Sequence, residues 1–156
     1  MFEWIENSAL AIWVGESLWG YPIMLGMHAV GLAIVVGIFV MLDLRMLGVI
    51  RGVSFAAFQS LFRLAWLGLI VNTLSGSALF SSQATTFVDS VPFLTKITGV
   101  ILGVVFGILI QCRLKARVND WDAADSNIES SARGLAAASL ICWIGAIFAG
   151  RLIAYL

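Results

Sequence analysis

Four apolar segments, each about as long as a bilayer is thick, constrain the fold of this chain more than any other feature. A helix needs about 20 consecutive apolar residues to cross the hydrocarbon core of a membrane. The segments that reach this length cover approximately residues 22–42, 58–80, 92–112 and 134–155. Because backbone polar groups in lipid must bond within the chain, spans of this kind form α-helices. We therefore expect an all-α integral membrane protein, with one transmembrane domain built as a four-helix bundle.

Composition supports this class. The chain of 156 residues is 61% hydrophobic and 12% charged, whereas soluble domains average roughly 45–50% apolar and 25% charged residues. The formal net charge is zero, which gives no basic surface for nucleic acid. Cys112 and Cys142 have no metal-type spacing and are expected to pack as small apolar residues. The lipid bilayer is the partner that composition predicts.

The segment before the first span predicts a short helix at the membrane surface. Residues 8–21 alternate apolar and polar side chains at helical spacing, and Ser8 stands where an N-cap is expected. Trp13, Trp19 and Tyr21 fall near the membrane boundary, where aromatic rings are enriched. We expect an N-terminal interfacial helix in this segment.

The basic residues predict the orientation of the spans. Seven of the nine Lys and Arg residues flank the two connections that lie on one side, namely Arg45, Arg51, Arg63, Arg113, Lys115, Arg117 and Arg133. Only Lys96 and Arg151 lie toward the other side. Since positive charge favours the cytoplasmic side, both termini are predicted to face outward, which is the periplasm for a bacterial inner membrane. The acidic segment 119–130 is then a solvated cytoplasmic loop.

Four polar residues are predicted to share one level of the outer leaflet. At about 1.5 Å per helical residue, His28, Asn72, Lys96 and Arg151 all lie roughly 6–12 Å from the outer ends of their spans. An ionisable group inside a membrane is a functional hypothesis by default. Taken singly, the two cations also fit snorkelling to the interface, and the other two fit hydrogen bonds between helices. A second polar level toward the cytoplasm is expected to hold a structural ion pair between Asp43 and Arg63.

Small residues accompany this outer layer. Gly99, Gly103 and Gly107 repeat every four residues on the face that carries Lys96. Such a stripe allows close approach of either a neighbouring helix or a flat ligand. In the first span, Gly31 follows the only histidine of the chain by about one turn, and Met24 precedes it by one turn. We interpret Gly31 as clearance beneath the imidazole and Met24 as a wall of a pocket.

The combination predicts a haem b protein for electron transfer or redox sensing. His28 is the expected axial ligand, Lys96 and Arg151 are expected to hold the propionates, and Met24, Gly31, Asn72, Gly99 and Gly103 are expected to line the macrocycle. With one histidine, the iron is five-coordinate, takes another ligand or shares one with a second subunit. No combination of residues indicates a stand-alone enzyme.

Two stretches resemble a known family. HAVGLAIVVGIFVMLDLRMLG (28–48) and AGRLIAYL (149–156) resemble a bacterial family of small four-span inner-membrane proteins of unknown function. The histidine, the D-L-R at 43–45 and the G-R-x-I-A-Y at 150–155 carry the resemblance, whereas family members often have a glutamate where Met24 stands. The resemblance implies the fold and the location, but no established reaction. The family is only loosely similar to copper-resistance membrane proteins.

Two other hypotheses remain open at this point. In the first, the chain is a cofactor-free scaffold, either a homo-oligomer or an accessory subunit of a larger membrane complex, and the glycine stripe is its contact face. In the second, Met24, Met27 and His28 handle copper, because thioether and imidazole ligands suit Cu(I).

Overall fold

A computed structural model describes residues 2–123, 128–153 and 155 and confirms the helical bundle. In these residues the secondary structure is entirely helical. The helices long and apolar enough to cross a membrane are α3 (Gly20–Met46), α4 (Phe55–Ser81), α6 (Val91–Ala123) and α7 (Ser130–Leu152). The short helices are α1 (Glu3–Glu6), α2 (Ala9–Glu16) and α5 (Ala84–Val88). The chain is therefore a multi-pass membrane protein of four packed helices.

α3, α4 and α6 contain the predicted spans 22–42, 58–80 and 92–112 and extend beyond them, whereas α7 begins before the predicted span 134–155 and ends at Leu152, three residues short of its predicted end. α3 continues past the predicted end at residue 42 to Met46, and α6 continues to Ala123. The predicted loop 119–130 therefore begins as helix, and its residues 124–127 lie outside the described residues, as does residue 154 of the fourth span. Non-helical dihedral angles at Arg117 (φ −131°, ψ 16°) mark a kink in α6, so its last turns form a separate piece.

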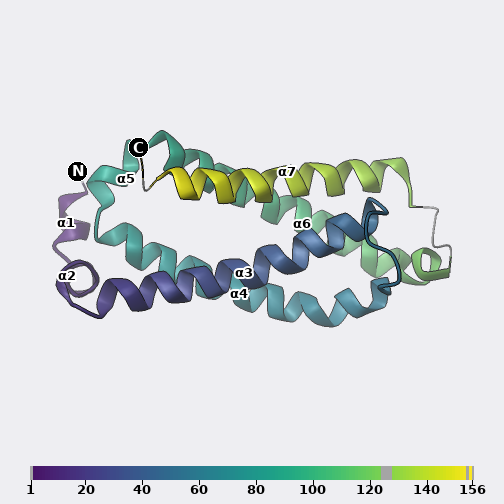
Figure 1. The fold of residues 1–156 in the computed structure, drawn as a ribbon, viewed down its shortest axis with the longest axis horizontal. Coiled ribbons are helices and arrows are strands. Elements are labelled where there is room, and N and C mark those ends of the chain that lie inside the picture. Colours follow the sequence, from purple (N-terminus) through teal and green to yellow (C-terminus); the bar gives the residue numbers. More distant parts are fainter. Residues whose placement is uncertain (1, 124–127, 154, 156) are drawn as a thin grey trace.

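The four long helices pack in the cyclic order α3, α4, α6, α7. Figure 1 shows α3 and α4 crossing each other, with α6 and α7 running alongside. The short helices α1, α2 and α5 lie together at one end of the bundle, called the α5 end below (Figure 1). At mid-bundle, Phe39 of α3 packs between Phe62, Trp66 and Trp143, with ring centroids 5.7–6.1 Å apart. This aromatic layer is the centre of the apolar core.

Glycines allow the helices to approach closely. A Cβ atom on Gly31 would lie 2.7 Å from the Asn72 backbone nitrogen and 2.8 Å from the Gly68 carbonyl oxygen, so α3 touches the backbone of α4. On α6, Gly103 and Gly107 make room for the rings of Trp143 and Phe39, which a Cβ would meet at 2.9 Å and 2.7 Å. The predicted stripe is therefore filled here by side chains of this same chain.

The end opposite α5 is held by hydrogen bonds between segments far apart in the sequence. The Asp122 carboxylate accepts from the backbone N–H groups of Phe55 (2.6 Å) and Ala56 (3.1 Å), and from the Ser54 hydroxyl (2.8 Å). It thus satisfies the free N–H groups in the first turn of α4. Arg45 donates from Nε to the Val53 carbonyl (2.7 Å) and lies over the Phe55 ring.

The predicted ion pair between Asp43 and Arg63 is wrong. Asp43 is completely buried, and neither carboxylate oxygen has a hydrogen-bond partner among the described residues. Arg63 is exposed on α4. The sequence places both residues near the same membrane level, but Asp43 turns toward α7, where Ser139 is its polar neighbour.

The N-terminal segment packs across the α5 end. Ser8 caps α2 as predicted, since its hydroxyl accepts from the Ala11 N–H at 3.2 Å. Glu6 of α1 reaches α5 and accepts from the Thr85 backbone N–H (2.8 Å) and hydroxyl (2.7 Å). These bonds satisfy the start of α5, whose own N-cap residue Gln83 makes no side-chain cap.

We predict that Gly31→Ala destabilises the bundle by roughly 1–3 kcal/mol, because the added methyl group overpacks the crossing of α3 and α4. Gly37→Ala on the same helix is the matched control, since no atom lies within 4 Å of its Cβ position. That control should be neutral or stabilising, because alanine favours helix over glycine. Thermal unfolding in detergent measures both, and equal midpoints for the two variants would contradict the proposed contact.

We also predict an acid-sensitive contact between α1 and α5. The side-chain and backbone hydrogen bonds from Thr85 hold the pKa of Glu6 below its ordinary value. Stability from this contact is therefore present above the ordinary glutamate pKa and is lost as pH falls through the lowered one. The thermal midpoints of wild type and Glu6→Gln should differ at neutral pH and converge in acid. Glu16→Gln removes the same charge elsewhere and should show no such convergence.

Candidate functional site

The imidazole of His28 on α3 is held by α4. Its Nδ1 atom lies 3.0 Å from the backbone carbonyl oxygen of Asn72. The Asn72 side-chain amide donates in return to the backbone carbonyl of His28 at 2.9 Å. The Ser75 hydroxyl completes the group 3.5 Å from Nδ1. The two helices are thus linked in both directions by hydrogen bonds at one level of the bundle.

Lys96 approaches the same imidazole from α6. Its Nζ atom lies 3.1 Å from Nε2 of His28, and this is its hydrogen-bond partner among the described residues. Its stem runs along α7 at Gly150, where a Cβ would lie 3.3 Å from the Lys96 Cδ. A lysine within a membrane helix is costly, by roughly 2.5–3.5 kcal/mol at the centre. Among the described residues, the partner of this half-buried ammonium group is an imidazole rather than a carboxylate.

The two shortest ring contacts of His28, at 3.0 Å and 3.1 Å, favour one tautomer over the longer contacts that the Asn72 amide nitrogen makes with the ring, at 3.3 Å and 3.5 Å. The carbonyl oxygen of Asn72 can only accept a hydrogen bond, so Nδ1 must carry the proton in this contact. The ammonium group of Lys96 can only donate, so Nε2 must offer its lone pair. A histidine that ligates a metal commonly has this arrangement, with its second ring nitrogen bonded to a backbone carbonyl.

A cavity of about 450 Å³ lies beside this group, between α4 and α6. His28, Asn72 and Lys96 form its polar part, and Phe80, Phe93, Ile97, Val100 and Ile101 supply apolar walls. Thr73 and Ser77 of α4 and Ile97 and Ile101 of α6 line it and are themselves exposed, so the cavity opens sideways toward lipid. A lipophilic molecule with a polar group suits this shape.

Three of the four residues predicted to share a level lie together, and the fourth does not. Asn72 and Lys96 each make a hydrogen bond with His28. Arg151 is exposed and donates to the Tyr155 hydroxyl at 3.1 Å, with its guanidinium group 5.4 Å from the centre of that ring. It does not line the cavity. Of the two cations predicted to face one ligand, Lys96 therefore lines the cavity and Arg151 does not.

The residues predicted to line the macrocycle beside His28 contact other parts of the bundle. Gly31 lies against the α4 backbone, and Gly99 lies against Cys142 and Ala146 of α7. Gly103 lies against Trp143. Met24 is half-buried and does not line the cavity. The glycine that does contact the imidazole is Gly76, where a Cβ would lie 2.9 Å from the His28 Cε1 atom.

Sequence reasoning did not assign four residues around the imidazole and cavity, namely Ser75, Gly76, Phe80 and Phe93. A signal existed for the first two, because they share the helical face of Asn72. The two phenylalanines stack with ring centroids 5.3 Å apart at the cavity, and Phe87 of α5 stacks on both. These aromatic residues have no sequence signal beyond their hydrophobicity.

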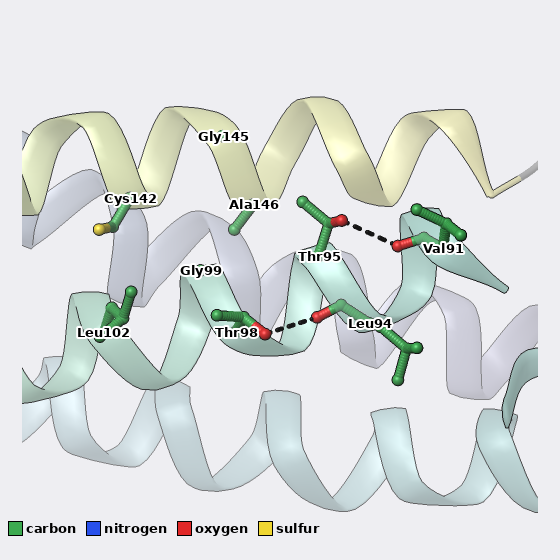
Figure 2. Close-up of a pocket in the computed structure, with 9 residues that line it drawn as sticks. All are labelled: Val91, Leu94, Thr95, Thr98, Gly99, Leu102, Cys142, Gly145 and Ala146. Carbon is green, nitrogen blue, oxygen red and sulfur yellow. Dashed lines mark hydrogen bonds between the residues drawn. The ribbon is translucent and has the colours of Figure 1, made fainter. Parts of the chain in front are cut away.

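A second hollow lies on the other side of α6, between α6 and α7 (Figure 2). Its volume is about 420 Å³, and Gly99, Gly145 and Ala146 make it shallow and apolar. Thr95 and Thr98 also line it, but their hydroxyl groups donate to carbonyls of their own helix, at 2.8 Å and 2.9 Å (Figure 2). With these donors used internally, this hollow offers no polar group comparable to the His28 site.

No family model, curated protein or solved structure matches this chain. The described residues also contain no group of three or more His, Cys, Asp and Glu side chains able to hold a metal ion. Among the residues that line the cavity beside Lys96, His28 is the one whose side chain commonly ligates a metal.

We predict that His28 is protonated on Nδ1 and unprotonated on Nε2. Because the chain has one histidine, ¹⁵N labelling of histidine reports this residue alone. The NMR spectrum should show a directly bonded proton on Nδ1, and Lys96→Met should shift the Nε2 signal more than the Nδ1 signal. A proton found on Nε2 in the wild-type protein would contradict the assigned hydrogen bonds.

Proposed function

We propose that this chain binds haem b through Nε2 of His28 and serves in electron transfer or redox sensing. The observation that carries the proposal is the bond from Nδ1 of His28 to the Asn72 carbonyl, which fixes the ring and leaves Nε2 basic beside a cavity. Axial ligation by a neutral imidazole is the ordinary mode of haem binding. When bound, haem supplies one-electron redox chemistry.

The residues around the cavity are compatible with this group. The cavity of about 450 Å³ falls within the range of roughly 300–1,000 Å³ typical of cofactor sites. Phe80 and Phe93 supply apolar surface to a flat ring, and Gly76 has no side chain to press on the Cε1 edge of the imidazole. Lys96 is the cation available to a propionate, which would form a charge-assisted bond with it.

Lys96 also has to change partner in this proposal. Its ammonium group now donates to the Nε2 lone pair that an iron ion would need. A lysine has a flexible four-carbon stem, and the bare backbone of Gly150 leaves that stem space. Lys96 therefore holds the imidazole in the correct tautomer when it donates to Nε2, and it is freed for a carboxylate when Nε2 is used.

The membrane context is part of the proposal. We place the chain in a bacterial inner membrane with both termini in the periplasm, because seven of its nine basic residues flank the connections at the opposite end. This orientation puts the His28 site in the periplasmic half. A homo-oligomer or a larger membrane complex would supply a redox partner, and a second iron ligand that this chain does not offer at the cavity.

No specific contact in the described residues favours the copper hypothesis or the scaffold hypothesis. Met24 and Met27 do not line the cavity beside His28, so the thioether groups proposed for copper are not gathered there. Gly99, Gly103 and Gly107, proposed as a contact face of a scaffold, lie against α7 and α3 within this chain.

We predict a Soret band and a positive pyridine haemochrome assay for protein expressed with ample iron. His28→Ala should abolish both. Lys96→Gln should lower haem affinity about tenfold, the equivalent of one charge-assisted hydrogen bond of about 1.5 kcal/mol. Arg151→Gln is the matched control, because it removes a cation from the same end of the bundle but not from the cavity. Colourless wild-type protein under these conditions would refute the proposal, and equal losses in both cation variants would refute the role of Lys96.

A further inference from the structure

A second polar group lies on the seam between α3 and α7, away from the His28 cavity. Four buried polar atoms in the described part of the chain have no hydrogen-bond partner: Oδ1 and Oδ2 of Asp43 on α3, and Oγ of Ser139 and Nε1 of Trp143 on α7. All three side chains are completely buried. Native proteins leave few such atoms, and an ordered water or ion commonly explains them.

The three residues occupy neighbouring levels of one seam. Ser139 is the polar neighbour of the Asp43 carboxyl group on α7, although their geometry does not make a direct hydrogen bond. One turn away, Phe39 of α3 stacks on Trp143 of α7, with centroids 5.7 Å apart and planes inclined by 14°. Phe39 and Asp43 are four residues apart on α3, and Ser139 and Trp143 are four residues apart on α7. Each pair therefore lies on one face of its helix.

In the described part of the chain, no cation is found to pair with the Asp43 carboxyl group. Arg45, two residues along α3, is directed to the Val53 carbonyl and the Phe55 ring. The cations of the adjoining helices are exposed, namely Arg63, Arg113, Lys115 and Arg133. An ionised carboxylate buried without donors is far costlier than a neutral acid, so the acid keeps its proton.

The donors and acceptors on the seam indicate which ligand completes them. A neutral carboxylic acid and a hydroxyl group each have a hydrogen to donate, which suits a water molecule rather than a metal cation. Ser139 can donate and accept, and a protonated carboxylic acid can do both. We propose that the α3–α7 seam contains a bound water molecule that bridges Asp43 and Ser139, with Asp43 present as a neutral carboxylic acid.

Infrared difference spectroscopy on the full chain in nanodiscs tests both parts. At neutral pH the wild type should show the C=O band of a protonated carboxylic acid, which shifts in D₂O. Asp43→Asn should remove this band. Exchange into H₂¹⁸O should shift an O–H band of weakly bonded water, and Ser139→Ala should remove that water band while leaving an altered carboxylic acid band.

Asp122→Asn is the matched control, because Asp122 accepts three hydrogen bonds and should be ionised without contributing to either band. Should Asp43→Asn fail to fold, Ser139→Ala still decides the question through the frequency of the Asp43 band. Absence of a protonated carboxylic acid band in the wild type would overturn the neutral acid. A carboxylic acid band without any water band sensitive to ¹⁸O would overturn the bound water.

Discussion

The close crossing of α3 and α4 is the contact on which the polar chemistry of this bundle depends. Gly31 and Gly68 bring two backbones together, and this brings the side-chain amide of Asn72 within reach of the His28 carbonyl. In water such hydrogen bonds are exchanged for bonds to solvent at little cost. In lipid each unbonded group costs several kcal/mol, so the partners stay together. A steric property of two glycines thereby orients the only imidazole of the chain.

The level of each residue along its helix could be predicted from the sequence, but the neighbour it faces could not. The rise per residue is fixed, so a hydropathy pattern that marks the span ends also sets the depth of His28, Asn72 and Lys96. The direction of a side chain around the helix axis identifies its neighbour only when the positions of the other helices are known. Lys96 and Gly99 differ by about 60° around α6, yet one turns to His28 and the other lies against α7.

Asp43 is a second residue whose level could be predicted but whose neighbour could not. Consecutive spans are the natural first choice of partners, and this favoured Arg63 of α4. In the cyclic order of the bundle, however, α3 also has α7 as a neighbour, and Asp43 is on that side. The cavity could not be predicted from the sequence either, because it exists where α4 and α6 pack less closely than the other neighbouring pairs of helices. Differences of this kind arise from the shapes of many side chains, such as Phe80 and Phe93, rather than from any single motif.

The two polar groups of the bundle are separated by its aromatic layer. Val35 and Phe39 are completely buried between the levels of His28 and Asp43, and Phe39 packs against Phe62, Trp66 and Trp143. Among the described residues, no series of side-chain hydrogen bonds joins His28 to Asp43. In the part of the chain that the structure describes, the aromatic layer therefore keeps the polar group at His28 apart from the polar group at Asp43.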